Sequence, residues 1–332
     1  MKKKLFIWCC DLNKQSGEGI LAIKFINDLK KNNKKITIIT KNISKKKLEF
    51  LRKFFGKLTD RIILPLCGLF YLWYIFIFKK NKRVCYVNFL PLWNFIIFLT
   101  LPPKTIFGPI TGGSKYLNKT FKNYLFREIL FKFFYSLSIR LLIYRNQNIL
   151  FSTDLLKKYI HKFGKFNYNY VFSNFKYFDK KFIRKYDIIF YLRKHENKNI
   201  DLLIKIAEKL SQKFEIITIG EKIKNSKIKN FGKISRRKLN LLLQQTKYSF
   251  LSPENIYSFY SLDCLSNGVH VFYNNKNNPL VEIKSNMSGL NYNNYKILIK
   301  KLMAILNSKQ KIQKKIIFKS TNNFNNLFKI YF

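Results

Sequence analysis

The sequence has few acidic residues, few histidines and no C-x-x-C pair of cysteines, and each shortage argues against a class of protein. Its 332 residues include 17 Asp and Glu against 64 Lys and Arg, a net charge of +47. Neither a disulfide framework nor a zinc site is supported by five scattered cysteines without a C-x-x-C pair, so a reducing cytoplasm fits best. The three histidines are too far apart in sequence for a convincing metal cluster, and we expect no metal. These residues are Cys9, Cys10, Cys67, Cys85 and Cys264, and His161, His195 and His270.

The sequence also lacks a clear targeting or membrane-spanning segment. The first apolar run, 5–10, is short and is followed by a polar loop, so no cleavable signal peptide is expected. Residues 62–78 form 17 residues without a charge, at the lower edge of spanning length. Pro65 and Gly68 weaken this segment as a continuous helix, and its many aromatic residues also suit an interfacial or buried helix. We expect the latter, and a true span is the alternative.

The strong positive charge has two explanations. On composition alone it suggests a nucleic acid or an anionic membrane as partner. However, the excess is nearly all Lys and accompanies heavy use of Asn, Ile, Phe and Tyr, residues with A/T-rich codons, so codon bias explains it equally well. Because the lysines are spread along the chain and no RNA- or DNA-binding module is evident, no specific nucleic-acid partner is predicted.

Strand and helix patterns alternate along the chain, which predicts an α/β fold. The first half opens with strand 3–10, a glycine-bearing loop 11–19, helix 20–30 and strand 35–40, the start of a doubly wound domain. Its other predicted elements are helices 48–55, 62–78, 126–142 and 153–163, strands 83–87, 105–107 and 148–152, and an apolar element 91–101.

The second half repeats the alternation after a basic, aromatic crossing at 171–186. The predicted elements are strands 187–191, 214–220, 228–231 and 248–251, helices 200–210, 235–246 and 295–306, and an Asn- and Lys-rich tail. Segment 252–255 supplies turn chemistry and a helix cap, and Asn267-Gly268 ends the helix that follows. We therefore predict two Rossmann-like domains, 1–172 and 173–332, with the final helix and tail beginning at about 295.

Groups that suit a phosphorylated ligand follow the strands of the second half. Two such domains place the loops at the carboxyl ends of both sheets around one cleft. Arg193 and Lys198 follow one strand and suit a diphosphate, because Arg grips two oxygens and Lys supplies a point charge. Gly220 and Glu221 follow the next strand, and Asp263, one helical segment beyond the last turn, suits a pair of sugar hydroxyls.

The second half resembles the retaining GT-B glycosyltransferases of sequence family 4, also called glycosyltransferase group 1. The family's G-R and K-N motif stands here as Leu192-Arg193 and Lys198-Asn199. Its run S-x-x-E-G-F-G-x-x-x-x-E-A-x-x-x-G-x-P-V is similar to 252–271. Further similar segments are Glu282-Ile283 with Gly289, the glycine loop Ser16-Gly17-Glu18-Gly19, and a GP-x-x-GG loop at 108–113.

The resemblance implies a GT-B fold and a set of site residues. Arg193, Lys198 and Glu254 would be catalytic, and Gly108, Thr111, Gly112 and Gly113 would form an acceptor-side loop. Donor-binding residues would be Gly17, Gly19, Arg193, Lys198, Gly220, Glu254, Asn255, Ile256, Tyr257 and Asp263. Asp263 stands for the family's second Glu, which holds the ribose hydroxyls. Asn255 stands for the first Glu, which contacts the donor sugar, so either Glu254 replaces it, or donor specificity has changed, or activity is lost.

The function implied is metal-independent transfer, with retention, from a nucleoside-diphosphate sugar to a glycan or lipid-linked acceptor. Surface polysaccharide assembly, such as O-antigen or capsule, is the expected setting. The nucleotide sugar is a substrate, and no cofactor is expected. The basic, aromatic first half is expected to dock on the anionic inner face of the cytoplasmic membrane. The alternatives are a catalytically impaired member, or a basic protein that binds membranes or nucleic acid.

Overall fold

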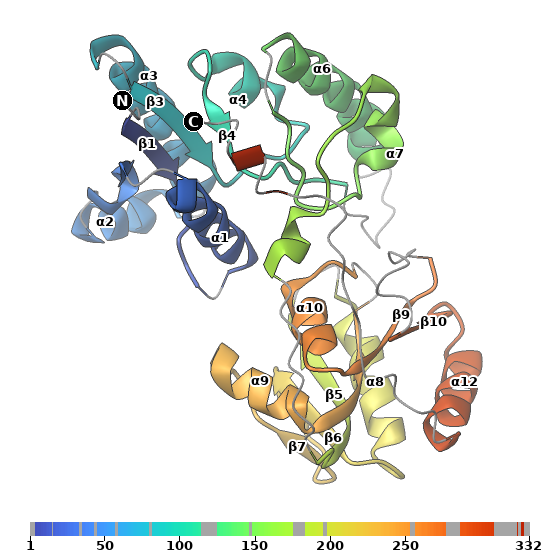
Figure 1. Ribbon diagram of the computed structural model, residues 1–332. Coiled ribbons are helices and arrows are strands. Elements are labelled where there is room, and N and C mark those ends of the chain that lie inside the picture. The colour runs from blue at the N-terminus through green and yellow to red at the C-terminus, as the bar shows by residue number, and fades with distance from the viewer. Residues whose placement is uncertain are drawn as a thin grey trace. The chain divides into compact units, whose positions relative to one another are not determined.

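The chain forms two compact units, which Figure 1 shows in a computed structural model. Unit 1 consists of Met1–Gly113, Thr120–Asn174 and Ser320–Phe332, and unit 2 of Ser114–Lys119 and Phe175–Lys319. The structure describes all residues except 1–3, 15, 33–34, 43–44, 57–58, 80–81, 114–124, 146–147, 175–182, 195–197, 253–255, 277–285, 309–323, 325–326 and 329–332.

Unit 1 is built on a four-stranded parallel sheet with strand order β2-β1-β3-β4. The strands are β1 (Lys4–Cys9), β2 (Ile36–Ile38), β3 (Lys82–Val87) and β4 (Ile106–Phe107). The helices are α1 (Gly17–Asn32), α2 (Lys45–Phe55), α3 (Leu64–Phe78), α4 (Phe95–Thr100), α6 (Phe131–Tyr144) and α7 (Lys157–Ile160). Both faces of β1 are apolar, as expected for a parallel strand covered on both sides.

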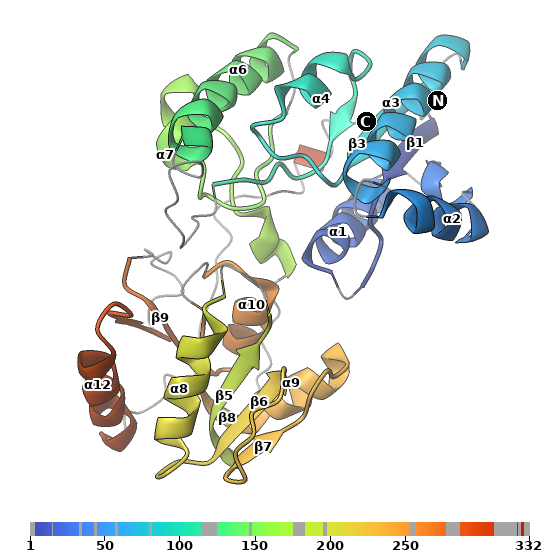
Figure 2. The same ribbon diagram turned by 180° about the vertical axis from the view of Figure 1, so that it is seen from behind.

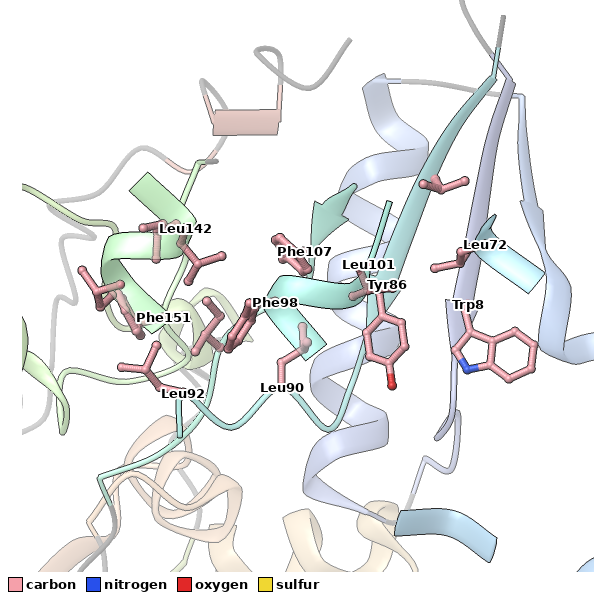
Figure 3. Close-up of a cluster of buried hydrophobic side chains, with 14 of the residues drawn as sticks. Trp8, Leu72, Tyr86, Leu90, Leu92, Phe98, Leu101, Phe107, Leu142 and Phe151 are labelled. Carbon is pink, nitrogen blue, oxygen red and sulfur yellow. The ribbon is translucent and has the colours of Figure 1, made fainter. Parts of the chain in front are cut away.

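The core of unit 1 gathers on the face of the sheet that carries Trp8 and Tyr86, which pair in register on β1 and β3 (Figure 3). Leu72 of α3 and Phe98 of α4 belong to the same buried cluster. Gly68 lets α3 approach closely, because a Cβ there would lie 2.3 Å from the Trp8 ring nitrogen. The glycine therefore supports helix packing, and α3 runs without interruption where we expected it to be weakened.

Segment 148–163 of unit 1 differs clearly from the sequence prediction. The predicted strand 148–152 makes isolated bridges only, from Leu150 to Asn167 and from Phe151 to Ile110. The predicted helix 153–163 is reduced to α7 and a short 3-10 turn, His161–Phe163. Both segments are apolar enough to be buried, and periodicity alone does not separate a buried strand from a buried irregular segment.

Unit 2 contains a six-stranded parallel sheet with strand order β10-β9-β8-β5-β6-β7. The strands are β5 (Tyr186–Leu192), β6 (Ile216–Gly220), β7 (Ile228–Asn230), β8 (Thr246–Phe250), β9 (His270–Asn274) and β10 (Met287–Leu290). Strand β10 was not predicted. The helices are α8 (Ile200–Leu210), α9 (Arg236–Gln244), α10 (Phe259–Ser266) and α12 (Tyr295–Asn307). Figure 2 shows α8 from its exposed side, and α8 and α12 share one buried cluster with Phe190 and Phe250.

Two aromatic residues near the end of the sequence, Phe324 and Phe328, pack on unit 1, whereas the prediction places them in the second domain, 173–332. Phe328 is buried, with its ring centroid 5.5 Å from that of Phe25 and 6.0 Å from that of Tyr170. Phe324 makes an edge contact of 5.3 Å with Tyr170. The composition of the Asn- and Lys-rich tail predicts little rigid structure, and within it Phe328 is buried because its aromatic ring supplies a large apolar area.

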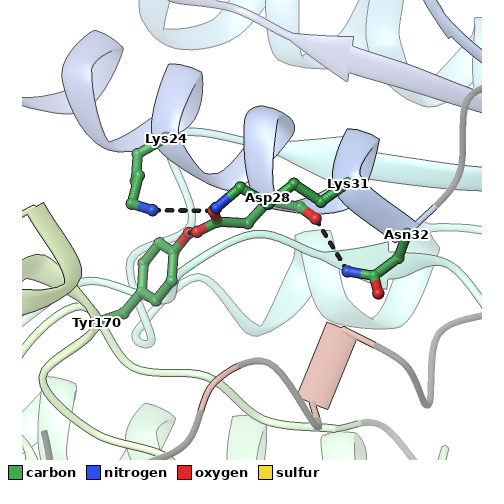
Figure 4. A network of polar contacts seen from close by, with 5 residues as sticks. All are labelled: Lys24, Asp28, Lys31, Asn32 and Tyr170. Carbon is green, nitrogen blue, oxygen red and sulfur yellow. Dashed lines mark hydrogen bonds and ion pairs between the residues drawn. The ribbon is translucent and has the colours of Figure 1, made fainter.

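Tyr170, in the short 3-10 helix Tyr170–Asn174, also contacts α1 through a polar network (Figure 4). Its hydroxyl donates a 2.6 Å hydrogen bond to Asp28 Oδ2, while Lys24 Nζ lies 2.8 Å and Lys31 Nζ 3.1 Å from Oδ1. Burial alone would raise the pKa of Asp28, but the hydrogen bonds from Lys24, Tyr170 and Lys31 hold it below its ordinary value. Asp28 is therefore a paired structural carboxylate.

Candidate functional site

The strand order of unit 2 marks one position where a ligand is expected. From β5 the chain proceeds outward to β6 and β7, then returns to the other side of β5 with β8, β9 and β10. The connections leaving β5 and β8 therefore run to opposite faces of the sheet. In open α/β sheets, ligands bind at the carboxyl ends of the strands at such a reversal. Arg193 follows β5 there, and the described residues 256–258 lie between β8 and α10.

Gly220 joins the ends of β5 and β6 at this edge. Its φ is +92°, and a Cβ would lie 2.0 Å from the Leu192 carbonyl oxygen. The Glu221 backbone N–H donates a 2.9 Å hydrogen bond to the same oxygen. Only glycine fits here, because any side chain would strike the residue that precedes Arg193. The predicted site residue Gly220 thus has a backbone role that positions the end of β5.

Helix α10 begins later than predicted, and a different residue caps it. Ser258, and not a residue of segment 252–255, accepts a 3.1 Å hydrogen bond from the Ser261 N–H. Tyr260 anchors the helix, since its hydroxyl lies 2.9 Å from Ser249 Oγ on β8 and its ring 5.1 Å from Tyr191 on β5. The first turn of α10 is therefore fixed against both strands of the reversal, with its free amides at the sheet edge.

The opposite end of α10 is held by Arg184. One guanidinium nitrogen donates to the Leu243 and Thr246 carbonyls at 3.0 and 2.7 Å. The other donates to Asn267 and Gly268 at 3.0 and 3.3 Å. A cation at helix C-termini is electrostatically favourable. Arg184 thus fixes the ends of α9 and α10 relative to each other.

Asp263 is paired with an arginine that the sequence did not indicate. Arg236 Nη2, at the start of α9, lies 2.7 Å from Asp263 Oδ1, and the aspartate side chain is 13% exposed. Burial raises the pKa of Asp263, and the hydrogen bond and charge of Arg236 limit that rise. The pair leaves Oδ2 as the second acceptor of the carboxylate. The two residues are 27 positions apart on different helices, so no motif spacing could have shown them together.

The remaining predicted residues of unit 2 are distributed as follows. Arg193 is exposed and Lys198 half-buried. Asn199 adopts a left-handed conformation, φ +43°, at the start of α8. The side chains of Ile256 and Tyr257 are buried, so they belong to the packed interior. Glu254 and Asn255 lie outside the described residues.

The glycines predicted in unit 1 are placed differently from the expected loop. Gly17 and Gly19 form the first turn of α1, so the loop is shorter than 11–19. Ser16 Oγ accepts a 2.9 Å hydrogen bond from the Gly19 N–H and donates to Asp11 Oδ2. A Cβ at Gly19 would lie 2.2 Å from the Asn13 carbonyl oxygen, so this glycine closes the turn.

The strand reversal of unit 1 lies between β1 and β3 and carries a polar network. Cys9 Sγ donates a 2.5 Å hydrogen bond to Asn88 Oδ1, and Asn88 Nδ2 donates at 3.0 Å to the Glu18 carbonyl. Burial, reinforced by the charge of Asp11, raises the pKa of Glu18. Burial likewise raises the pKa of the Cys9 thiol, so this cysteine is not a nucleophile.

The glycine loop 108–113 packs within unit 1. Thr111 bridges to the segment after β3, with its N–H donating to Leu90 and its carbonyl accepting from Leu92, both at 2.9 Å. The φ values of Gly112 and Gly113 are +141° and +79°, and a Cβ at Gly113 would lie 2.8 Å from the Leu155 backbone. A Cβ at Gly108 would lie 3.2 Å from the Val87 Cα atom. Close packing within the unit is thus one requirement that these glycines meet.

The described residues also bear on metal binding and membrane crossing. No three His, Cys, Asp or Glu side chains among them could together hold a metal ion. None of the helices in the described part of the chain is long and apolar enough to cross a membrane.

Comparisons with known proteins establish the fold. No family model matches the sequence, and no curated protein matches it. A putative UDP-N-acetylglucosamine 2-epimerase from Listeria monocytogenes matches with a TM-score of 0.56 and 11% identity, over 98% of this chain and 94% of the other. The UDP-GlcNAc 2-epimerase of Methanocaldococcus jannaschii, in complex with UDP-GlcNAc and UDP, gives 0.53 and 14%, over 99% of each chain.

A third solved structure is similar over a smaller part of both chains. It is a TarM mutant from S. aureus in complex with fondaparinux, α-GlcNAc-glycerol and UDP, with a TM-score of 0.52 and 14% identity. The match covers 81% of this chain and 55% of the TarM chain. Together with the two parallel sheets, these similarities show an α/β protein with a GT-B-like fold.

Proposed function

We propose that this protein is a nucleotide-sugar enzyme, and specifically a metal-independent glycosyltransferase that retains anomeric configuration. The observation that carries the proposal is the edge of unit 2 at the β5/β8 reversal. There, Arg193 and the first turn of α10 follow the two central strands, and Asp263 offers a carboxylate oxygen one turn further along. The structures with similar folds that hold UDP or UDP-GlcNAc support this choice of ligand class.

Each group has a chemical role in this proposal. Arg193 and Lys198 neutralise the departing diphosphate, and the backbone amides at the start of α10 add partial positive charge. Asp263 accepts from a ribose hydroxyl through Oδ2, while Arg236, bound to Oδ1, limits the rise that burial causes in the pKa of this carboxyl group. Glu254 or Asn255 contacts the donor sugar. Catalysis then rests on positioning and charge neutralisation, without an enzyme nucleophile.

The acceptor in this proposal is a glycan or a lipid-linked sugar. Gly108, Thr111, Gly112 and Gly113 contribute on the acceptor side, and Gly17 and Gly19 on the donor side. Assembly of a surface polysaccharide at the inner face of the cytoplasmic membrane is the proposed setting. The support is the basic composition together with the aromatic helices of unit 1.

The second candidate is epimerisation of a UDP-sugar. The matches to two 2-epimerase structures over nearly the full length of both chains favour it. The products separate the two functions. An epimerase converts its UDP-sugar without an acceptor and returns a UDP-sugar, whereas a transferase releases nucleoside diphosphate.

The first test is a thermal-shift screen of the whole protein against UDP-, GDP- and ADP-sugars. A donor at 100 times its Kd should stabilise the folded protein by about 2.7 kcal/mol. The donor found in this way is then incubated with the protein, and released nucleoside diphosphate and epimerised sugar are both measured. If no nucleotide sugar raises Tm, the proposal is wrong; if one binds without turnover, the protein is a catalytically impaired member.

The second test removes single cations. Arg193→Ala and Lys198→Ala should each weaken donor binding by about 2–3 kcal/mol, or about 30- to 150-fold, because each loses a charge-assisted contact to phosphate. Lys194→Ala is the matched control, since Lys194 is an exposed cation next to Arg193. Turnover that is equal in all three variants and the unmodified protein would rule out this site.

A further inference from the structure

Helix α3 of unit 1 is apolar on every side, but only one side of it is covered. Leu64, Gly68, Leu72 and Ile75 form the buried stripe against the sheet. The opposite side exposes large apolar and aromatic side chains, among them Phe70 at 72% and Ile77 at 61% exposure. We call this set the α3 outer face; it consists of Leu66, Phe70, Tyr71, Tyr74, Ile77 and Phe78. A helix without a polar side requires an apolar surrounding on both sides.

The length of α3 indicates which apolar surrounding the helix can occupy. Its 15 residues give about 22 Å at 1.5 Å per residue, against about 30 Å for the hydrocarbon core of a bilayer. The helix also packs along the sheet of unit 1 over its whole buried stripe. It can therefore lie in the interfacial layer of a membrane but cannot span it, and its Tyr and Phe side chains suit that depth.

The apolar surface continues onto the neighbouring helices. Trp73 of α3 donates a 2.7 Å hydrogen bond to the Thr100 carbonyl at the end of α4, so the two helices are joined. Helix α4 exposes Ile96 and Leu99. Helix α2, which precedes α3, exposes Phe50 and Phe54. Exposed aromatic residues thus occur on successive helices of the same unit.

Basic residues flank these apolar side chains in the sequence. From Lys45 to Lys80 the sequence carries nine Lys and Arg against two Asp and Glu, a net charge of +7. Among the described side chains, Lys46 and Lys53 of α2 and Lys79 at the end of α3 are exposed. Lysines next to an exposed aromatic surface are complementary to anionic lipid headgroups above acyl chains.

We propose that the α3 outer face inserts into the interfacial layer of an anionic lipid bilayer, with the lysines of α2 and the end of α3 on the headgroups. The orientation that follows places the sheet of unit 1 away from the membrane, with α3 parallel to its plane. This docking specifies the membrane setting of the proposed function, but it is tested separately from the enzyme activity, because binding to lipid is measured without any nucleotide sugar.

The test is flotation of the whole protein with vesicles of phosphatidylcholine, alone or with phosphatidylglycerol. Strong binding is expected only with phosphatidylglycerol, and it should weaken in high salt. Phe70→Ser with Ile77→Ser should lower vesicle affinity by about tenfold or more, because two large apolar side chains are lost from the lipid contact. Leu241→Ser with Ile297→Ser is the matched control, since both residues are similarly exposed apolar positions of unit 2.

A second readout locates the contact. All three tryptophans, Trp8, Trp73 and Trp93, belong to unit 1. Brominated lipid should therefore quench the fluorescence of the unmodified protein, and quench the Phe70/Ile77 variant much less. Thermal unfolding of the variant should match that of the control, because the replaced side chains are exposed.

Three results would overturn the proposal. One is an equal affinity of the Phe70/Ile77 variant and the unmodified protein for phosphatidylglycerol vesicles. Another is the absence of binding to any vesicle at low salt. The third is a dimer that dissociates in the Phe70/Ile77 variant without any lipid binding, which would assign the α3 outer face to a second copy of this chain.

Discussion

At the scale of single residues, His270 is a buried titratable group with a clear consequence for stability. It lies buried on β9 between Tyr248 and Phe272, with Nε2 2.8 Å from Ser288 Oγ. Burial lowers its pKa to about 4 from an ordinary 6.5. The imidazole is therefore neutral in the folded protein at neutral pH, and it acts as a packing residue of the sheet.

The depressed pKa of His270 predicts a pH dependence of stability. Between pH 6.5 and about 4 the unfolded chain binds a proton at this residue and the folded protein does not, so the free energy of unfolding falls as the pH falls. The loss should approach about 3 kcal/mol at pH 4. His270→Asn should remove this part of the dependence, as measured by urea unfolding at pH 7 and pH 5.

The Asp and Glu side chains titrate in both the His270→Asn variant and the unmodified protein, so their contribution to the loss of stability cancels when the two proteins are compared. If His270→Asn and the unmodified protein lose the same stability between pH 7 and pH 5, then His270 is protonated in the folded state, and its placement is wrong.

Single residues also show where sequence reasoning ends. Asp263 was predicted from its position in a motif, and its role with a donor stays a prediction. Arg236, its partner, was missed because helix–helix contacts are set by the packing of α9 on α10 and leave no trace in local spacing. The same holds for Arg184, whose four carbonyl acceptors come from segments 59 to 84 residues away.

At the scale of secondary-structure elements, the turn after β6 depends on Gly220. Gly220→Ala should destabilise the protein by about 2–4 kcal/mol, because the backbone conformation is unfavourable for a side chain and the new Cβ meets the Leu192 carbonyl. Chemical denaturation measures the loss. Donor affinity should fall as well, since Leu192 precedes Arg193.

Gly232→Ala is the control for that substitution. Its φ is also positive, +62°, but a Cβ there would meet only the Lys222 side chain at 3.7 Å. The expected cost is about 1 kcal/mol, that of a left-handed residue alone. Equal effects at both positions would show that the contact with Leu192 does not constrain the turn.

The elements were predictable to the extent that their signals are local. Helix α8 was predicted with its observed bounds, 200–210, because its apolar residues follow a helical period and Asp201 lies in its first turn. The parallel, doubly wound character of both sheets also followed from alternation. Strand β10 was missed because Met287–Leu290 is short and contains a glycine, and the strand forms only where β9 offers an edge.

At the scale of the whole molecule, the closing aromatic residues of the chain support unit 1. Phe328→Ala should destabilise unit 1 by about 3–5 kcal/mol, the cost of truncating a buried Phe. Tryptophan fluorescence is the suitable probe, because every tryptophan lies in unit 1. Phe328→Ala should lower the denaturation midpoint that tryptophan fluorescence reports. The stability of unit 2 without a donor, measured by hydrogen exchange of the β5 and β8 amides, should not change.

Phe324→Ala is the graded comparison, since Phe324 is only half-buried and touches Tyr170 at one edge. It should cost less than Phe328→Ala. A fluorescence midpoint that is unchanged in both variants would mean that the tail does not contribute to unit 1.

The contact of Phe328 with Phe25 and Tyr170 has a consequence for the order of synthesis. A ribosome makes the sheet of unit 1 first and its closing aromatic residues only after all of unit 2. Unit 2 is thus an insertion within unit 1 in covalent terms, and its strands are contiguous in the growing chain. Unit 2 can finish folding during translation, whereas unit 1 must wait with an open aromatic surface until residue 328 has left the exit tunnel.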